Sequence, residues 1–369
     1  DISGDIDIDG TTNLDVVDID GAVDMASTLQ VDGAITGSST INGVGILSNA
    51  TNFGEGLLIS QDAGTGTLSS ANRNTGFGYE VFDDLTSGDD NTGFGQQALA
   101  KLTTGGTNTA LGSNALETNT TGASNTALGF GSLDANTTAS NNTAVGTNSM
   151  GANTTGTSNV GVGRHALLLN TTGDSNVAVG LNSLAANTTA DNNTAVGFSA
   201  LTANTTGTGL VAVGMNALSA NTTADDNTAL GKGTLGVNTT GASNTGLGRG
   251  ALGSNTTGSN NAAVGKFALT SNTTGANNVA VGQSAQTATT TGNDNVGIGR
   301  QALDANTTGG ANVAVGSDAL GANTTASNNT ALGYQALIAN TTGAQNTAVG
   351  ASAGVALTTG GSNVAVGFE

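Results

Sequence analysis

The sequence predicts an all-β fold, a parallel β-solenoid built from 17-residue coils. From Asn74 to Phe368 one motif recurs eighteen times without a change of spacing. Its first position is Asn in every copy except at Leu210, and its fifth is Gly in every copy, from Gly78 to Gly367. A 17-residue unit is too short for two helices and their turns, and its Val and Thr favour strands. The strict period indicates that each copy forms one coil stacked on a similar neighbour.

We number the positions of each coil from 1 to 17, starting at this Asn, and call a set of equivalent positions a column. The consensus is Asn-Thr/Val-Ala-Val/Leu-Gly-x-x-Ala/Ser-Leu-x-Ala-Asn-Thr-Thr-Gly/Ala-x-x. This composition approaches low complexity. Apolar residues nevertheless keep a fixed phase, which a disordered polar tract has no reason to do, so the pattern predicts a folded array.

Composition excludes several classes of protein. The 369 residues include 59 Gly but no Pro, Cys or Trp, and 9% are charged. Without Cys there is neither a disulfide framework nor a Cys metal site. No run of 18 apolar residues occurs, so we expect no membrane insertion. The sequence opens at Asp1 rather than at Met, and we expect a processed product or a fragment.

Charge is distributed unevenly along the chain, whose net charge is −19. The first 100 residues carry 16 Asp and Glu against Arg73 alone, a balance of −15. The remaining residues carry 10 acids against 6 bases, a balance of −4. An acidic surface repels nucleic acid and anionic membranes, so we expect neither as a partner.

Residues 1–48 predict an acidic shaft or assembly segment of short strands. Turn dipeptides recur at Asp9-Gly10, Asp20-Gly21, Asp32-Gly33 and Asn42-Gly43, with Ile and Asp alternating between the first of them. The candidate metal ligands are Asp5, Asp7 and Asp9, which match the start of a calcium loop. The twelfth loop position is Val16 instead of a bidentate Glu, so we prefer a solvent-facing acidic strand and expect no cofactor.

The array has an irregular beginning. Residues 49–107 are predicted to form a transition, a cap and the first coils, because terminal repeats must close an open core. Leu68 lies one full period before Leu85, and Phe77 and Phe94 occupy a column that is otherwise Val, Leu or Ile. Residues 108–369 form the regular coils.

Two strands are predicted in each coil. In the first, column 4 is large and apolar, as at Leu111, and column 3 is always Ala or Gly. Successive strand side chains face opposite sides, so we expect column 4 to face the core and column 3 to face outward. The second strand carries the column 9 residue, Leu116 and its equivalents, with Gln286 and Gly354 as exceptions.

Such a core is thin. Two large apolar side chains per coil contribute on the order of 4 kcal/mol of burial, which the entropy of ordering a whole coil easily offsets. A small outward column would let a neighbouring chain approach closely along the whole length. We therefore expect a homo-oligomer.

The repeat resembles two related groups of proteins. Its pentads, such as Asn142-Thr-Ala-Val-Gly146 and Asn193-Thr-Ala-Val-Gly197, resemble the repeats in YadA-like heads of trimeric autotransporter adhesins. The longer unit from Asn329 to Gly343 is similar to arrays in phage and prophage tail fibre proteins. The resemblance covers about 290 residues and implies a left-handed parallel β-roll in a homotrimer. The usual head unit is shorter, and the heptad stalk and membrane barrel of the adhesins are not among these residues.

Two polar columns are predicted to form structural ladders. Asn-Thr-Thr recurs in columns 12 to 14, and each copy is formally a glycosylation sequon. We prefer stacked side-chain hydrogen bonds, because Leu replaces this Asn at both ends of the array and so marks an inward column. The predicted ladder residues are Asn108, Asn125, Asn142, Gly112, Gly129, Gly146, Asn119, Asn136 and Asn153.

An ice-binding solenoid is a remote alternative. Flat solenoids that bind ice present two outward ranks of Thr, which requires Thr at every second position. Here the two Thr of each unit are adjacent, so an extended chain would turn them to opposite sides.

No catalytic constellation is present, and we expect no enzyme. His165 is the single His, and neighbouring Asp pairs such as Asp83 with Asp84 point apart in a strand. The Gly-rich stretches follow the structural period and lack the Lys of a phosphate loop. The candidates for surface contact are the irregular positions Arg164, His165, Lys232, Arg249, Lys266, Phe267 and Arg300.

Together these features predict a structural fibre protein of a virion or cell surface, whose purpose is attachment to a host receptor or glycan. A bacterial surface adhesin of the trimeric autotransporter type is one alternative. A self-polymerising extracellular filament is another, suggested by the apolar end Val364, Val366 and Phe368.

Overall fold

The computed structural model describes residues 39–41, 44–50, 53–60 and 67–368. The chain divides into two units, Asp1–Thr36 and Gly37–Glu369, and the following concerns the second. Asp5, Asp7, Asp9 and most of the predicted shaft of residues 1–48 therefore lie outside the described residues.

A hairpin precedes the array. Strands β1 (Ser39–Ile41), β2 (Val44–Ala50) and β3 (Phe53–Ser60) pair antiparallel in order, and β3 then pairs in parallel with β4. Leu68 packs against the core, and the Ser69 amide donates to the Thr86 carbonyl in the equivalent position one coil ahead. The first, degenerate coil therefore lies in the segment predicted to hold the cap, residues 49–107.

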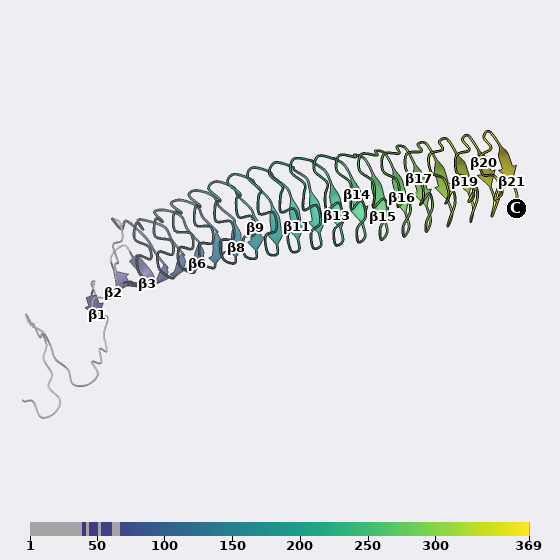
Figure 1. Ribbon diagram of the computed structural model, residues 1–369. Coiled ribbons are helices and arrows are strands. Elements are labelled where there is room, and N and C mark those ends of the chain that lie inside the picture. The colour runs from purple at the N-terminus through teal and green to yellow at the C-terminus, as the bar shows by residue number, and fades with distance from the viewer. Residues whose placement is uncertain (1–38, 42–43, 51–52, 61–66, 369) are drawn as a thin grey trace, which may run out of the picture. The chain divides into compact units, whose positions relative to one another are not determined.

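Eighteen three-residue strands follow, one in each coil, and stack in a single sheet (Figure 1). They are β4 Thr75–Phe77, β5 Thr92–Phe94, β6 Thr109–Leu111, β7 Thr126–Leu128, β8 Thr143–Val145, β9 Val160–Val162, β10 Val177–Val179, β11 Thr194–Val196, β12 Val211–Val213, β13 Thr228–Leu230, β14 Thr245–Leu247, β15 Ala262–Val264, β16 Val279–Val281, β17 Val296–Ile298, β18 Val313–Val315, β19 Thr330–Leu332, β20 Thr347–Val349 and β21 Val364–Val366.

Neighbouring coils are in strict register. Ala178 of β10 pairs with Ala195 of β11, and every later parallel pair keeps the same offset of one full period. Backbone bonds also link coils outside the sheet, as from the Thr120 amide to the Thr137 carbonyl. The predicted parallel β-solenoid with 17-residue coils is confirmed. No helix occurs in the described part of the chain, so none there is long and apolar enough to cross a bilayer.

The second predicted strand is wrong. The segment around column 9 is a series of turns, and Leu116 itself has a φ of +53°. In the coil that begins at Asn108, Asn114 and Ser124 also have positive φ. This conformation is unfavourable for residues with a Cβ. The sequence prediction missed it because alternation of side chains between two faces assumes an extended chain. Coil-to-coil hydrogen bonds, such as that from the Leu116 amide to the Ser132 carbonyl, hold these turns.

The orientation predicted for the remaining strand is also wrong. Column 3 faces the interior: Ala110, Ala127 and its other Ala residues up to Ala348 are fully buried. Column 4 faces outward, and Leu111 is 48% exposed. The interior is too thin for large side chains from both walls. Because the column 9 residue fills it from the turn side, the sheet side has room only for Ala or Gly.

The choice between Ala and Gly in column 3 follows the bulk of the facing side chain. A Cβ on Gly76 would lie 2.8 Å from the Phe82 ring, and one on Gly246 would lie 2.5 Å from Thr234 Cγ2. Gly161 faces Ser149 and Met150, Gly93 faces Val81, and Gly297 faces Gln286. At each of the five Gly residues of this column the facing side chain therefore occupies space that a Cβ would need.

The invariant Gly of column 5 has a separate cause. Gly112, Gly129 and Gly146 have φ values of +143°, +134° and +127°, a region that residues with a Cβ rarely adopt. A Cβ on Gly112 would also lie 2.5 Å from the Gly129 carbonyl oxygen. The same close approach repeats from coil to coil, so this column cannot vary.

Replacing Gly246 with Ala tests the size compensation. We expect Gly246→Ala alone to destabilise the fold by about 1–3 kcal/mol, because its Cβ overpacks against Thr234. Adding Thr234→Ala should recover most of this loss, since Ala is common at column 8. Thermal unfolding of the two single variants and the double variant gives the coupling energy. Additive effects would contradict the proposed contact.

Candidate functional site

A continuous row of apolar side chains lies on the outer face of the sheet. Column 4 supplies one residue from every coil, and we call this row the apolar ladder. Its members are exposed or half-buried, with Phe77 at 55% and Leu332 at 48%. They are Phe77, Phe94, Leu111, Leu128, Val145, Val162, Val179, Val196, Val213, Leu230, Leu247, Val264, Val281, Ile298, Val315, Leu332, Val349 and Val366.

The apolar ladder is exposed yet never polar. Solvent-facing columns normally accept Lys, Glu, Ser or Asn, as column 6 accepts Lys, Arg and Ser here. At the N-terminal end the rings of Phe77 and Phe94 stack with centroids 6.3 Å apart. The open apolar area is on the order of 1,000 Å², beyond the few hundred Å² usual for one patch on a monomer. Such a surface marks an interaction site.

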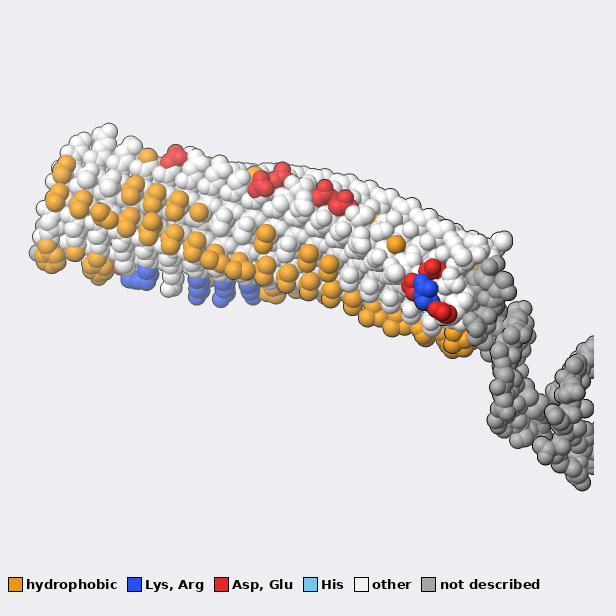
Figure 2. Space-filling view, turned by 180° about the vertical axis from the view of Figure 1, so that it is seen from behind, with side chains coloured by type: hydrophobic (Ala, Val, Ile, Leu, Met, Phe, Trp, Pro, Cys, Tyr) orange, Lys and Arg blue, Asp and Glu red, His pale blue; other side chains and the backbone are white. Residues whose placement is uncertain are grey.

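The predicted contact residues share one edge of the strand face. Arg164, Lys232, Arg249, Lys266 and Arg300 all occupy column 6, directly after the invariant Gly, and all are exposed. Figure 2 shows Lys and Arg side chains gathered in a row along one edge of the solenoid, with Asp and Glu groups along the other. His165 and Phe267 occupy column 7 and are half-buried.

Three of these cations lie on consecutive coils and define what we call the basic cluster: Lys232, Arg249 and Lys266. The Phe267 ring lies between two of them, with Arg249 Cζ at 5.5 Å and Lys266 Nζ at 5.1 Å from its centroid. Among the described residues none of the three has a carboxylate within 4.0 Å. Arg300, two coils beyond, instead pairs with Asp318 at 3.0 Å.

One group of acidic residues occupies the opposite edge, in columns 16 and 17. In column 16 their carboxylates bond the backbone of the preceding coil: Asp174 Oδ1 accepts from the Thr157 amide at 2.6 Å, and Asp225 Oδ1 from the Thr208 amide at 2.7 Å. Asp191 accepts similarly from the Asp174 amide. These carboxylates therefore have a structural role at the turn.

The two Asn columns lie inside the solenoid and are buried. In column 1, Asn125 Nδ2 donates to the Ala139 carbonyl at 2.8 Å, while its Oδ1 accepts from the Asn142 amide at 3.0 Å. The Asn125 amide in turn donates to Asn108 Oδ1. Each side chain thus joins two coils and also bonds to the backbone.

Column 12 is built in the same way. Asn136 Nδ2 donates to Asn119 Oδ1 at 2.9 Å, and Asn153 Nδ2 donates to Asn136 Oδ1 at 3.1 Å. Because these amides are fully buried, the folded chain offers no access to them for glycosylation. The Thr120 hydroxyl that follows donates to the Thr137 carbonyl, and only the next column, Thr121, is exposed.

Several other charged groups have local partners. Arg73 bonds Asp90, which lowers the pKa of that carboxyl, and Lys101 lies 3.3 Å from Asp84. Burial, and then the neighbouring Glu117, raise the pKa of Asp134. Within the described residues no group of three or more His, Asp or Glu could hold a metal ion.

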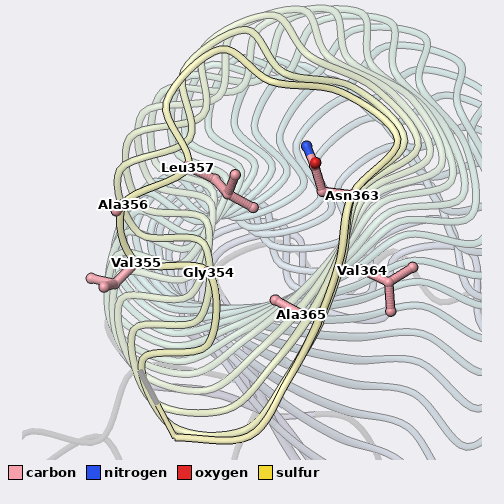
Figure 3. Close-up of a pocket in the computed structure, with 7 residues that line it drawn as sticks. All are labelled: Gly354, Val355, Ala356, Leu357, Asn363, Val364 and Ala365. Atoms are coloured by element: carbon pink, nitrogen blue, oxygen red, sulfur yellow. The ribbon is translucent and has the colours of Figure 1, made fainter.

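The C-terminal end of the described array is an open cross-section. A hollow of about 370 Å³ exposes the interior residues Gly354, Leu357, Asn363 and Ala365 (Figure 3). Val364, Val366 and Phe368 of the last coil are 76–77% exposed. Strand β21 pairs only with β20, so one of its edges is free for pairing.

Removing one Asn from column 1 tests the ladder. Asn125→Ala should cost about 2–4 kcal/mol, because the Ala139 carbonyl and the Asn142 amide each lose a buried partner. Asn125→Leu should cost less, since Leu210 shows that apolar volume is accepted in this column. Thermal unfolding of the three proteins provides the measurement, and equal stability would contradict a supporting role for the ladder.

Asp134 gives a pH-dependent prediction. Its folded-state pKa lies above the ordinary value of 3.8, so the folded chain binds more protons than the unfolded chain just above that pH. Stability is therefore lost as pH rises through this window. Asp134→Asn should stabilise the protein at pH 7, by up to about 1 kcal/mol for a half-exposed pair. The gain should vanish below pH 3.8. Unfolding curves at pH 7 and pH 3 measure it, and a gain independent of pH would contradict this assignment.

Comparison with known proteins leaves the function to be argued from these surfaces. The fold supports many functions, so the argument depends on what each surface could bind. No family model matches the sequence, and no curated protein shows significant similarity to it.

Proposed function

We propose that the protein is a structural fibre component in which copies associate side by side through the apolar ladder. The observation that carries this proposal is a column that is exposed in one chain and apolar in all eighteen coils. Its open area, on the order of 1,000 Å², is comparable to the ~800 Å² that one partner contributes to a stable interface. Association would remove from water the apolar surface that a single chain leaves open.

Three copies around one axis fit this surface best. The strands are three residues long, so each chain offers a narrow face rather than a broad sheet. A closed ring of such faces covers every ladder, whereas two narrow faces alone would leave their margins wet. This arrangement agrees with the homotrimer implied by the resemblance to adhesin heads and tail fibres. In this arrangement the apolar column 4 faces the neighbouring chain, and not the small column 3 as the sequence predicted.

Attachment at a virion or cell surface is the purpose that we propose for this fibre. A solenoid of eighteen coils at ~4.8 Å per coil is a rod of roughly 85 Å, suited to holding a binding surface away from its base. The interior columns vary little, while column 6 varies from Phe to Arg to Ser along the outside. Variation in an exposed column beside a constant interior is typical of a recognition surface on a rigid scaffold.

Two other assignments share this scaffold. A surface adhesin of the autotransporter type would differ in its anchor, and the genes beside the encoding gene would distinguish it from a tail fibre. A self-polymerising filament would bury Val364, Val366 and Phe368, which are exposed on the last described coil. Fibres that lengthen with protein concentration in micrographs would support that assignment.

Charging the apolar ladder tests side-by-side association. The four changes Val162→Lys, Val179→Glu, Val196→Lys and Val213→Glu alternate in sign, so neighbouring rungs attract and the single chain is not penalised. Light scattering should give three times the 35.3 kDa chain mass for the wild type and about the chain mass for this variant.

A matched control carries the same charges on the exposed Thr of column 14: Thr155→Lys, Thr172→Glu, Thr189→Lys and Thr206→Glu. It should retain the wild-type mass. A monomeric wild type, or equal loss of association in both variants, would refute the proposal.

A further inference from the structure

We propose that the basic cluster, together with Phe267, binds an anionic polysaccharide that lies along the solenoid axis. This inference names a ligand class for the attachment role and rests on that role. It does not require that copies associate, because all four residues belong to one chain.

The cations are uncompensated and held in a line. Lys232, Arg249 and Lys266 follow one another at the coil spacing, about 5 Å per step in a β-stack, and no described carboxylate lies within 4.0 Å of them. By contrast, Lys101 and Arg300 have carboxylate partners, and Arg164, which has none within 4.0 Å among the described residues, has no cation on either neighbouring coil. Three like charges on neighbouring rungs repel one another, so a bound polyanion would relieve this repulsion.

Phe267 provides a ring beside the charges. It is the single aromatic residue of column 7 in the regular coils, and its ring lies over the backbone of Gly250, where a Cβ would be 2.8 Å from Phe267 Cδ1. One coil before, a Cβ on Gly233 would meet no atom within 4 Å. Gly250 therefore leaves room for the Phe267 ring, and Gly233 leaves the space next to it open. Contact with the Phe267 ring restrains the side chains of Arg249 and Lys266.

This arrangement favours a linear polymer with recurring charges over other anions. A small anion would be bound by converging donors, whereas these cations lie in a row. The net charge of −19 opposes every polyanion, so the choice between nucleic acid and polysaccharide depends on the cations and the ring. In a polyuronate each sugar presents a carboxylate and an apolar ring face. The carboxylates suit the cations, and the ring face suits an aromatic ring.

Affinity electrophoresis of the full chain in gels containing alginate tests the proposal, with neutral dextran and single-stranded DNA as comparison probes. The triple variant Lys232→Ser, Arg249→Ser, Lys266→Ser should bind alginate at least about tenfold more weakly. Ser113 and Ser317 already occupy column 6, so this variant should fold. Phe267→Ser should weaken alginate binding about threefold, and Ser199 and Ser284 occupy its column.

The control variant Lys101→Ser, Arg164→Ser, Arg300→Ser loses the same charge from scattered positions, and it should bind within about twofold of the wild type. Three results would overturn the inference: no wild-type binding to alginate, equal binding by both triple variants, or equal binding of alginate and single-stranded DNA.

Light scattering on the same samples separates this inference from the fibre proposal. Association that persists without alginate binding refutes the ligand alone. Loss of association in the Lys232, Arg249, Lys266 variant would assign the basic cluster to contact between copies and would overturn the polysaccharide site.

Discussion

Each residue of the array lies against its own equivalent in the next coil, and this in-register stacking is the constraint on which the structure depends. Ala178 pairs with Ala195, Asn119 bonds Asn136, and a Cβ on Gly112 would meet the Gly129 carbonyl. A column is therefore not a set of independent positions. A residue type that stacks well on itself is favoured in every coil at once, which explains why the period is so strict.

The second constraint is the thinness of the interior, which is one large side chain deep. The column 9 residue fills it from the turn side, and Ala or Gly of column 3 closes it from the sheet side. Ala residues of column 8 add to this apolar part, and the two buried Asn columns complete the interior with hydrogen bonds to neighbouring coils and to the backbone. Where the pattern fails, the core divides: Gln286 separates two apolar clusters, and its Oε1 has no hydrogen-bond partner. We expect this coil to open more readily than its neighbours.

The thin interior also determines what is left outside. A strand has two faces, and if only small side chains fit inward, the large ones of column 4 must face solvent. The surplus apolar surface is thus a direct consequence of the coil's cross-section. The apolar ladder can associate with other copies although the charged basic cluster lies beside it, because charged residues are normal at the rim of an interface. The same chain can in this way combine a buried lateral face with a variable outer edge.

The sequence by itself determined the period, the coil length and the parallel stacking, because hydrophobic phase and an unbroken Gly column report backbone geometry directly. It also pointed to column 12 as an inward Asn column, since Leu85 and Leu102 replace Asn there and the structure buries both. It did not determine which strand face is inside. An alternating pattern shows that a strand has two different faces, but it does not show which face is buried. The prediction placed the larger residues in the core. Only the tertiary structure, which brings the Leu of column 9 across a narrow interior onto the Ala of column 3, decides that the small residues are buried. The positive φ of Leu116 was hidden for a similar reason, because hydrogen bonds between coils, and not local preference, stabilise it.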